Sequence, residues 1–205
     1  MLVLNSENTF NNINNLRDEL RAKTANSHKN LEFLSLSQAI VSPKVTKEEY
    51  ALYLNLMHDI QEKMEMEIFP LLENIILDLD NRKKSHHILA DLNAIGFQKK
   101  KSGKTLFFPS QISTAFALGM MYVIEGSTLG GRFILKNIET SLDYNLENGA
   151  SYFNGYGAKT GSTWKKFIDF MEDYETNNGN QEEIINGANV AFTMVGEHLS
   201  KNYNK

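Results

Sequence analysis

The sequence predicts an all-α protein with a single domain. Apolar residues recur at spacings of three and four through most of the chain, which is the pattern of amphipathic helices. No segment alternates apolar and polar residues as a half-exposed strand would, and only three prolines interrupt the 205 residues. No repeat and no linker divides the sequence. We therefore expect one helical domain over residues 1–205, with residues 1–12 as a flexible N-terminus.

The periodicity divides the chain into helices separated by polar or glycine-rich turns. Thr46 and Glu49 have the spacing of a capping box, which marks the start of a helix. Pro70 is expected to kink or divide the helix that follows. The expected helices are Ile13–Leu34, a helix from about Thr46 past Pro70, Asp80–Ile95, a long apolar helix capped by Ser110, a helix from about Trp164, and Gln181–Leu199.

Composition excludes several classes of function. The net charge of −4 provides no broad basic field for nucleic acid or an anionic membrane. The absence of cysteine excludes disulfides, thiolate metal sites and cysteine nucleophiles, and it is compatible with the reducing cytoplasm, where we expect the protein to act. Neither a signal peptide nor an apolar stretch of about 18 residues is present, so we expect no membrane anchor.

The stretch EGSTLGGR, residues 125–132, is unusual for the middle of a helix. Each glycine inside a helix costs about 1 kcal/mol relative to alanine, yet Gly126, Gly130 and Gly131 all lie here. The apolar periodicity of the segment predicts that Gly126 and Gly130 lie on the buried face. They could allow a tight helix–helix crossing or the close approach of a flat ligand. The hydroxyls of Ser127 and Thr128 favour the polar edge of a ligand pocket.

A flat ligand needs a second wall, and His28 is the candidate to provide it. It lies on or beside the apolar stripe of the first helix, one turn after Thr24. An inward neutral imidazole is the usual axial ligand of haem iron, although a buried core histidine has the same sequence pattern. Arg21 lies two turns before His28 on nearly the same face. Its guanidinium could pair with a carboxylate of the bound ligand, or it could be a solvated surface charge.

Three segments resemble the haem (heme) oxygenase family. LRAKTANSHKNLE, residues 20–32, is similar to the proximal helix of that family, and YVIEGSTLGGRFI, residues 122–134, is similar to its glycine-rich distal helix. GASYFNGYGAKTGSTWKKF, residues 149–167, resembles a segment of the bacterial, biliverdin-producing members associated with phytochromes. The resemblance implies a multi-helix bundle in which haem is sandwiched between the proximal helix and a kinked distal helix.

The resemblance also implies roles for individual residues. His28 would be the iron ligand, and the backbone of Gly126 and Gly130 would cover the other face of haem. Mammalian members carry an aspartate after the first of these glycines, where this chain has Ser127, so the polar network around bound oxygen would differ. Basic side chains would pair with the haem propionates. The candidate haem-binding residues are Arg21, Thr24, His28, Gly126, Gly130, Lys165 and Lys166.

The implied reaction uses haem b as both cofactor and substrate. Its macrocycle would be cleaved at a meso carbon, with O₂, to biliverdin, carbon monoxide and ferrous iron. Electrons would come from an external ferredoxin or reductase, because the sequence contains no flavin or nicotinamide fingerprint. The sequence leaves open which biliverdin isomer forms, and whether the reaction serves iron acquisition or phytochrome chromophore supply.

Two other functions compete with this hypothesis. A non-catalytic haem-binding protein would keep the same residues. A di-iron oxidase would need inward carboxylates and a Glu-x-x-His motif, which does not occur; its candidate ligands His58, Glu62 and Glu65 are expected to be exposed. Glu125 could face a metal only if the glycines did not. We expect the remaining histidines to lie on the surface and Trp164 to serve packing; those histidines are His86, His87 and His198.

Overall fold

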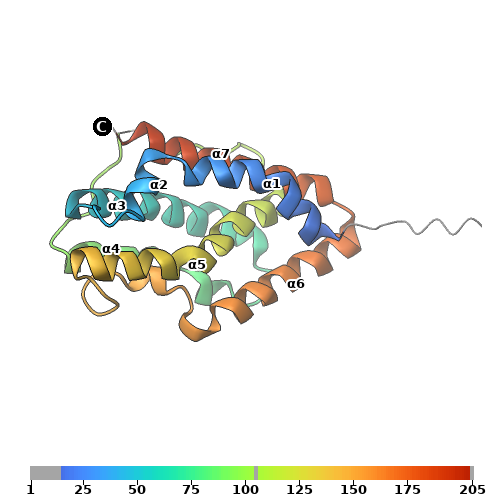
Figure 1. Cartoon of the computed structure of the whole chain (residues 1–205). Coiled ribbons are helices and arrows are strands. Elements are labelled where there is room, and N and C mark those ends of the chain that lie inside the picture. The colour runs from blue at the N-terminus through green and yellow to red at the C-terminus, as the bar shows by residue number, and fades with distance from the viewer. Residues whose placement is uncertain (1–14, 104–105, 204–205) are drawn as a thin grey trace, which may run out of the picture.

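The computed structural model describes residues 15–103 and 106–203, and this part of the chain contains helices and no strand. The all-α prediction is confirmed. The expected flexible N-terminus, residues 1–12, lies outside the described residues. Figure 1 shows the helices stacked lengthwise around one core. They are α1 (Leu16–Glu32), α2 (Ser35–Ile40), α3 (Lys47–Lys63), α4 (Ser85–Ala94), α5 (Thr114–Leu142), α6 (Thr160–Asn178) and α7 (Gln181–Lys201).

Helices α5 and α7 cross with their backbones in contact. A Cβ atom on Gly119 of α5 would lie 1.9 Å from the carbonyl oxygen of Ile184. A Cβ atom on Gly187 of α7 would lie 2.1 Å from the carbonyl oxygen of Phe116. Both positions therefore exclude any side chain. The tight helix–helix crossing considered for EGSTLGGR thus occurs in α5, but at Gly119, about two turns before Gly126.

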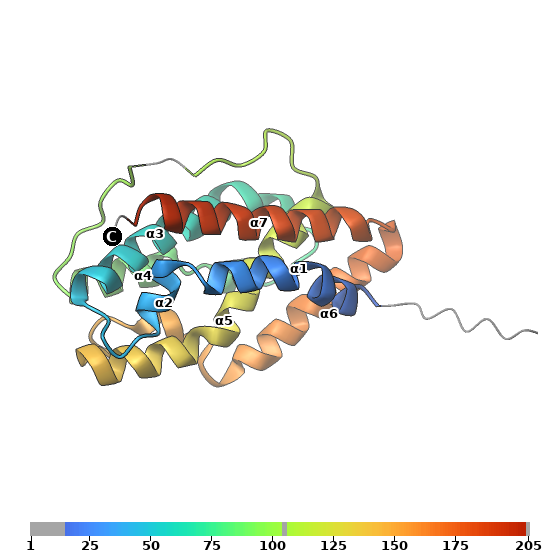
Figure 2. The same cartoon turned by 45° about the horizontal axis from the view of Figure 1, so that its top comes forward.

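Helix α1 packs along α7, as the two views in Figures 1 and 2 agree. Its buried residues Leu16, Leu20 and Thr24 follow the predicted stripe. The Ser27 hydroxyl donates a hydrogen bond of 2.7 Å to the Asn189 side chain of α7. Asn15 caps the start of α1 by accepting from the Asp18 amide. These contacts set the rotation of α1 about its axis. They therefore also set the direction of His28, which lies one turn after Thr24.

The chain between α3 and α4 contains the predicted interruption at Pro70. A π-helical turn, Met64–Ile68, leads into a 3-10 turn, Phe69–Leu72. The expected helix Asp80–Ile95 is wrong in its first part, because a 3-10 turn, Leu79–Arg82, is separated from α4. The Glu65 carboxylate accepts from the backbone amides of Lys84 and Ser85 at 2.6 and 2.8 Å. A side chain distant in sequence therefore sets where α4 starts.

Other helix ends agree with the sequence or differ by a few residues. The capping box of Thr46 and Glu49 is confirmed. Ser113, and not Ser110, caps α5: its hydroxyl accepts from the Phe116 amide at 3.1 Å. Helix α6 begins at Thr160, before the expected Trp164. Among the helices of the described residues, none is long and apolar enough to cross a membrane.

Candidate functional site

Helices α1 and α5 approach each other at one end and diverge towards the other, with α2 between their far ends (Figure 2). At the near end, the Tyr122 hydroxyl of α5 lies beside the Thr24 hydroxyl of α1. Burial raises the pKa of Tyr122, against the opposing effects of Thr24, Arg17 and Arg21. At the far end, the Asn137 side chain donates to the carbonyl oxygens of Ile40 and Ser42 at 3.0 and 2.9 Å.

Helical spacing then directs His28 and the distal glycines toward the same region between α1 and α5. Residues four apart share a helix face, so His28 follows Thr24 on α1 and Gly126 follows Tyr122 on α5. We name this region, between His28 on one side and Gly126 and Gly130 on the other, the α1–α5 site. The structure thus joins α1 and α5 at Thr24 and Tyr122, one turn before His28 and Gly126 respectively.

The His28 ring packs against α7 along one edge, and the side chain is otherwise accessible. The side chain is 59% exposed, and its Nδ1 atom lies 3.6 Å from a carboxylate oxygen of Glu32, one turn later. The ring packs edge-on against Phe192 of α7, with 5.7 Å between centroids. A histidine on this face would often be a buried core residue, but the structure leaves it open. An exposed imidazole with one packed edge is suited to binding a metal centre.

The glycines of EGSTLGGR have different environments. A Cβ atom on Gly130 would have no heavy atom within 4 Å, and one on Gly126 would make an ordinary contact of 3.6 Å with Trp164. The expectation that both lie on the buried face is therefore wrong, since Gly130 is exposed and Gly126 is partly exposed. Only Gly131 is required by the fold, because its Cβ would lie 2.5 Å from the carbonyl oxygen of Phe153.

The open side of α5 fits a flat apolar ligand. Phe133 is 80% exposed and Leu129 is 45% exposed, although both are large apolar residues on a helix whose other faces are well packed. Gly130 lies beside them on the helix surface and leaves space that any longer side chain would fill. A haem group would cover this apolar surface while its iron met the imidazole of His28. The residues present therefore fit haem.

The predicted cations do not all lie in the α1–α5 site. Arg21 is exposed on α1, and its charge acts on the Tyr122 hydroxyl at the near end. Lys165 pairs with Asp169 at 2.9 Å, and Lys166 pairs with Asp78 at 2.9 Å. The structure thus places Arg21 beside the site and engages both lysines with carboxylates of α6 and of the segment before α4.

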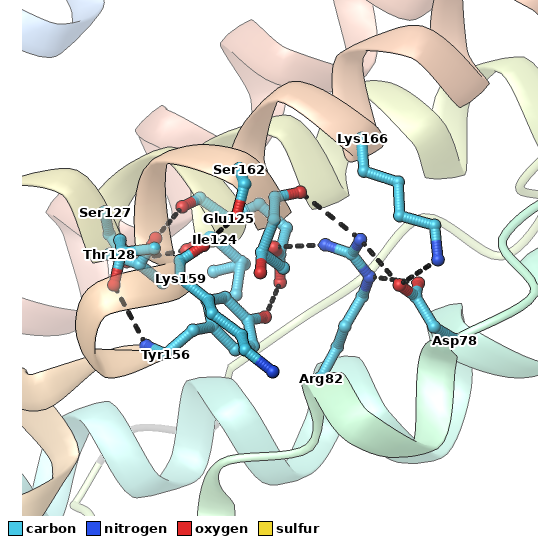
Figure 3. A network of polar contacts seen from close by, with 12 residues as sticks. Asp78, Arg82, Ile124, Glu125, Ser127, Thr128, Tyr156, Lys159, Ser162 and Lys166 are labelled. Atoms are coloured by element: carbon cyan, nitrogen blue, oxygen red, sulfur yellow. Dashed lines mark hydrogen bonds and ion pairs between the residues drawn. The ribbon is translucent and has the colours of Figure 1, made fainter.

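A buried ion pair anchors the residue directly before Gly126. Glu125 and Arg82 have side chains that are each 1% exposed, and Arg82 donates to Glu125 at 2.5 Å. Tyr156 donates to the other carboxylate oxygen at 2.7 Å. Figure 3 shows Arg82 between Glu125 and Asp78, which it also contacts at 2.7 Å. Glu125 therefore points away from the open face, and Arg82 is a residue that the helical periodicity gave no reason to select.

Ser127 lies at the border between the open face and a small internal cavity. Its hydroxyl donates to the carbonyl oxygen of Ile124 at 2.7 Å. The adjoining cavity, of about 30 Å³, is also lined by Lys84, Thr128 and Tyr152. Burial raises the pKa of Tyr152 to about 12, against the opposing hydrogen bonds with Gln61 and Ser127. A small, mainly apolar cavity therefore lies beside the distal glycines, and Lys84, Ser127, Thr128 and Tyr152 give it a few polar groups without a carboxylate at position 127.

His58 and His198 are buried, which contradicts the prediction that both are exposed. His58 is 3% exposed, and neither ring nitrogen has a hydrogen-bond partner within the described structure. Burial lowers its pKa. His198 lies 3.0 Å from the Asp59 carboxylate, which also binds Lys99 at 2.6 Å. Periodicity identified the apolar stripe of α3 but did not show that neighbouring helices cover its flanks as well.

The di-iron alternative lacks its ligands. Both carboxylate oxygens of Glu65 accept hydrogen bonds at the start of α4. One accepts from the Lys84 amide and the other from the Ser85 hydroxyl. Glu62 points outward and is more than half exposed. Within residues 15–103 and 106–203, no group of three or more histidine and acidic side chains could hold a metal ion. His86 and His87 are exposed, as predicted.

Comparisons with known proteins show the family of this chain and the origin of its fold. The family model described as "Heme oxygenase" matches residues 98–201, which include α5 and its glycines. "Heme oxygenase PigA" of Pseudomonas aeruginosa is 26% identical over 208 residues, covering 99% of this chain and 100% of that protein. That alignment therefore extends to α1, which the family model does not reach.

Solved structures share the arrangement of helices. The NO- and CO-bound heme oxygenase from Neisseria meningitidis superposes with a TM-score of 0.76 and 26% identity, over 92% of each chain. Heme oxygenase-1 from the cyanobacterium Synechocystis, solved in complex with heme, gives a TM-score of 0.69 and 19% identity over 91% of each chain. At that identity the second likeness concerns the fold alone.

The fold and its helices define an all-helical protein with an exposed histidine on α1 and a glycine-bearing helix α5. The family match covers half of the chain and includes that helix. The chain belongs to the haem oxygenase family, and it is an oxidoreductase that degrades haem.

Proposed function

We propose that the chain binds haem b in the α1–α5 site, with His28 as the iron ligand, and cleaves it to biliverdin, carbon monoxide and ferrous iron. This proposal rests on the combination of two features. The His28 side chain is 59% exposed, and a Cβ atom placed on Gly130 would have no heavy atom within 4 Å. Bound haem would supply the iron that activates O₂ and the meso carbon that is oxidised. A separate ferredoxin or reductase provides the electrons.

The chain's own residues orient the ligand and limit access to it. Gly126 and Gly130 let the backbone of α5 approach the ligand closely, so that a small molecule on that side has little room. Ser127 provides a hydroxyl at the edge of the site. The buried Arg82–Glu125 pair fixes the turn of α5 that carries Gly126. Rigid support of this kind holds a reacting group in one orientation.

Basic residues at the near end of the site orient the propionates. Arg21, beside Tyr122 and Thr24, is the main candidate, because its guanidinium can form two hydrogen bonds with a carboxylate. Lys165 and Lys166 are the further candidates. The Lys165–Asp169 pair is the more exposed, and exposed pairs contribute little, so Lys165 exchanges its partner more easily than Lys166 does.

A titration with haemin, followed by reduction under O₂, tests the proposal. The protein is expected to bind about one equivalent and then to replace the haem spectrum with that of biliverdin. His28→Ala is expected to change the haem spectrum and abolish normal turnover, whereas His86→Ala, an exposed histidine elsewhere, should alter neither. A stable haem spectrum in the unmodified protein would indicate a non-catalytic binder. Absence of haem binding would refute both functions.

A further inference from the structure

Lys84 is a buried lysine immediately behind the distal helix. It is 4% exposed, which is rare for a lysine. The Glu65 carboxylate fixes its backbone by accepting from its amide at 2.6 Å. Its ammonium lies 3.4 Å from the centroid of the Tyr156 ring, in a cation–π contact. The side chain is therefore held in place at both ends.

The Lys84 side chain contributes to the lining of the cavity that Ser127 borders. That cavity has a volume of about 30 Å³ and is lined by Lys84, Ser127, Thr128 and Tyr152, among others. One water needs about 10–15 Å³ of such volume and two to four polar partners. The Lys84 side chain can donate to a water, and the Ser127 and Tyr152 oxygens can accept from it, because the Tyr152 proton is directed to Ser127 and the Ser127 proton to Ile124. Ser127 is also exposed on the open face of α5.

We infer that Lys84 is the positioning residue of the cavity behind the distal helix, where the few polar groups of Lys84, Ser127 and Tyr152 hold a water that reaches the oxygen-binding side of the haem site. This inference rests on the proposed function. It gives the surroundings of Ser127 a charged side chain, supplied by the segment directly before α4. Ser127 then needs only to provide a hydroxyl.

The electrostatic surroundings suit a proton-donating group. Burial lowers the pKa of Lys84 to about 8, with Glu125 and Glu65 favouring the charged form and Arg82 opposing it. A donor whose pKa is close to the working pH is effective in proton transfer. The titratable and charged groups that face the ammonium or its cavity are Glu65, Arg82, His87, Glu125, Tyr152 and Tyr156.

The test compares Lys84→Met with Lys83→Met. Lys83 is the neighbouring lysine, but it is exposed and pairs with Asp80, so it controls for the loss of one charge in this segment. The first readout is the acid–alkaline transition of the ferric haem complex, measured by absorption. Loss of a nearby cation is expected to raise the midpoint by about one pH unit in Lys84→Met, and to leave it unchanged in Lys83→Met. Lys84→Arg, which keeps the charge, should fall closer to the unmodified protein.

Two further measurements complete the test. The Lys84 ammonium of the haem-free protein should titrate near pH 8 by NMR. Biliverdin formation should fall at least about tenfold in Lys84→Met, while haem affinity changes by less than about threefold. An unchanged midpoint and rate in a folded Lys84→Met protein would overturn the inference. If Lys84→Met does not fold, Ser127→Ala replaces it in the test. An unchanged midpoint of the acid–alkaline transition in Ser127→Ala would also overturn the inference. Absence of biliverdin in the unmodified protein would instead refute the proposed function.

Discussion

Arg82 donates a hydrogen bond to the buried carboxylate of Glu125 at 2.5 Å, and Glu125 directly precedes Gly126. The segment before α4 is therefore tied to the turn of α5 that bears the first distal glycine. A second hydrogen bond, from Arg82 to the carbonyl oxygen of Thr163 at 3.4 Å, joins α6 to the same guanidinium. One buried side chain thus links three elements around the site.

Removal of Arg82 should destabilise the fold strongly. Arg82→Ala leaves the Glu125 carboxylate buried and unpaired, which typically costs about 3–5 kcal/mol. Chemical denaturation measures this loss. The double variant Arg82→Met with Glu125→Leu should recover most of it, because the buried carboxylate is removed together with its Arg82 partner. Lys201→Ala, which breaks an exposed pair with Glu197, should cost less than about 1 kcal/mol. Equal costs for the two single variants would refute the anchoring role.

Gly130 and Gly131 should respond oppositely to alanine. Gly130→Ala places its methyl group in open space and improves helix propensity, so the haem-free protein should gain up to about 1 kcal/mol of stability. Gly131→Ala forces a methyl group to 2.5 Å from the Phe153 carbonyl oxygen and should cost about 1–3 kcal/mol. Thermal unfolding of the two haem-free variants distinguishes these outcomes. Stabilisation by Gly131→Ala would contradict the packing described above.

Gly130→Leu should separate folding from ligand binding. The larger side chain has room in the haem-free protein but fills the space that haem requires, so the helical content should persist while haem affinity falls by at least about 100-fold. Circular dichroism and haemin titration measure the two properties. Leu129→Ala on the neighbouring exposed position provides a control that removes bulk rather than adding it. Normal haem binding by Gly130→Leu would disprove close backbone approach as the reason for the glycine.

The Asp59 cluster should make stability fall in acid. Burial alone would raise the pKa of Asp59, but hydrogen bonds with His198, Lys99 and Ser102 hold it at about 2, below its usual 3.8. A carboxylate with a depressed pKa stabilises the fold above pH 4 and loses that contribution as the pH falls from about 4 to 2. Partial exposure limits the contribution to about 1–2 kcal/mol.

Asp59→Asn provides the comparison for that pH dependence. Between pH 5 and pH 2, the free energy of unfolding of Asp59→Asn should fall by about 1–2 kcal/mol less than that of the unmodified protein. Denaturant titrations across this pH range measure the difference. Asp169→Asn, in an exposed pair with Lys165, should leave the pH dependence almost unchanged. Identical profiles for the unmodified protein and Asp59→Asn would show that the cluster does not stabilise the fold.

Helix periodicity predicted the fold class and most helix positions because core burial imposes a repeat that is visible in one sequence. The same signal could not show where α4 begins, since the Glu65 carboxylate that caps it lies about twenty residues earlier. Nor could it show that His198 is buried, because the Asp59 carboxylate that contacts it comes from α3. Helix ends and buried polar groups depend on partners from other elements.

The sequence by itself determined the helical architecture, the histidine at position 28 and the unusual glycines of α5, because local propensity and spacing are properties of the chain alone. Only the tertiary structure decided what each glycine is for. Gly119 and Gly131 lie against the backbone of other segments, whereas Gly130 faces open space beside exposed apolar side chains. A glycine in the sequence shows only that a side chain is absent. Its structural role depends on which atoms surround it in the folded protein.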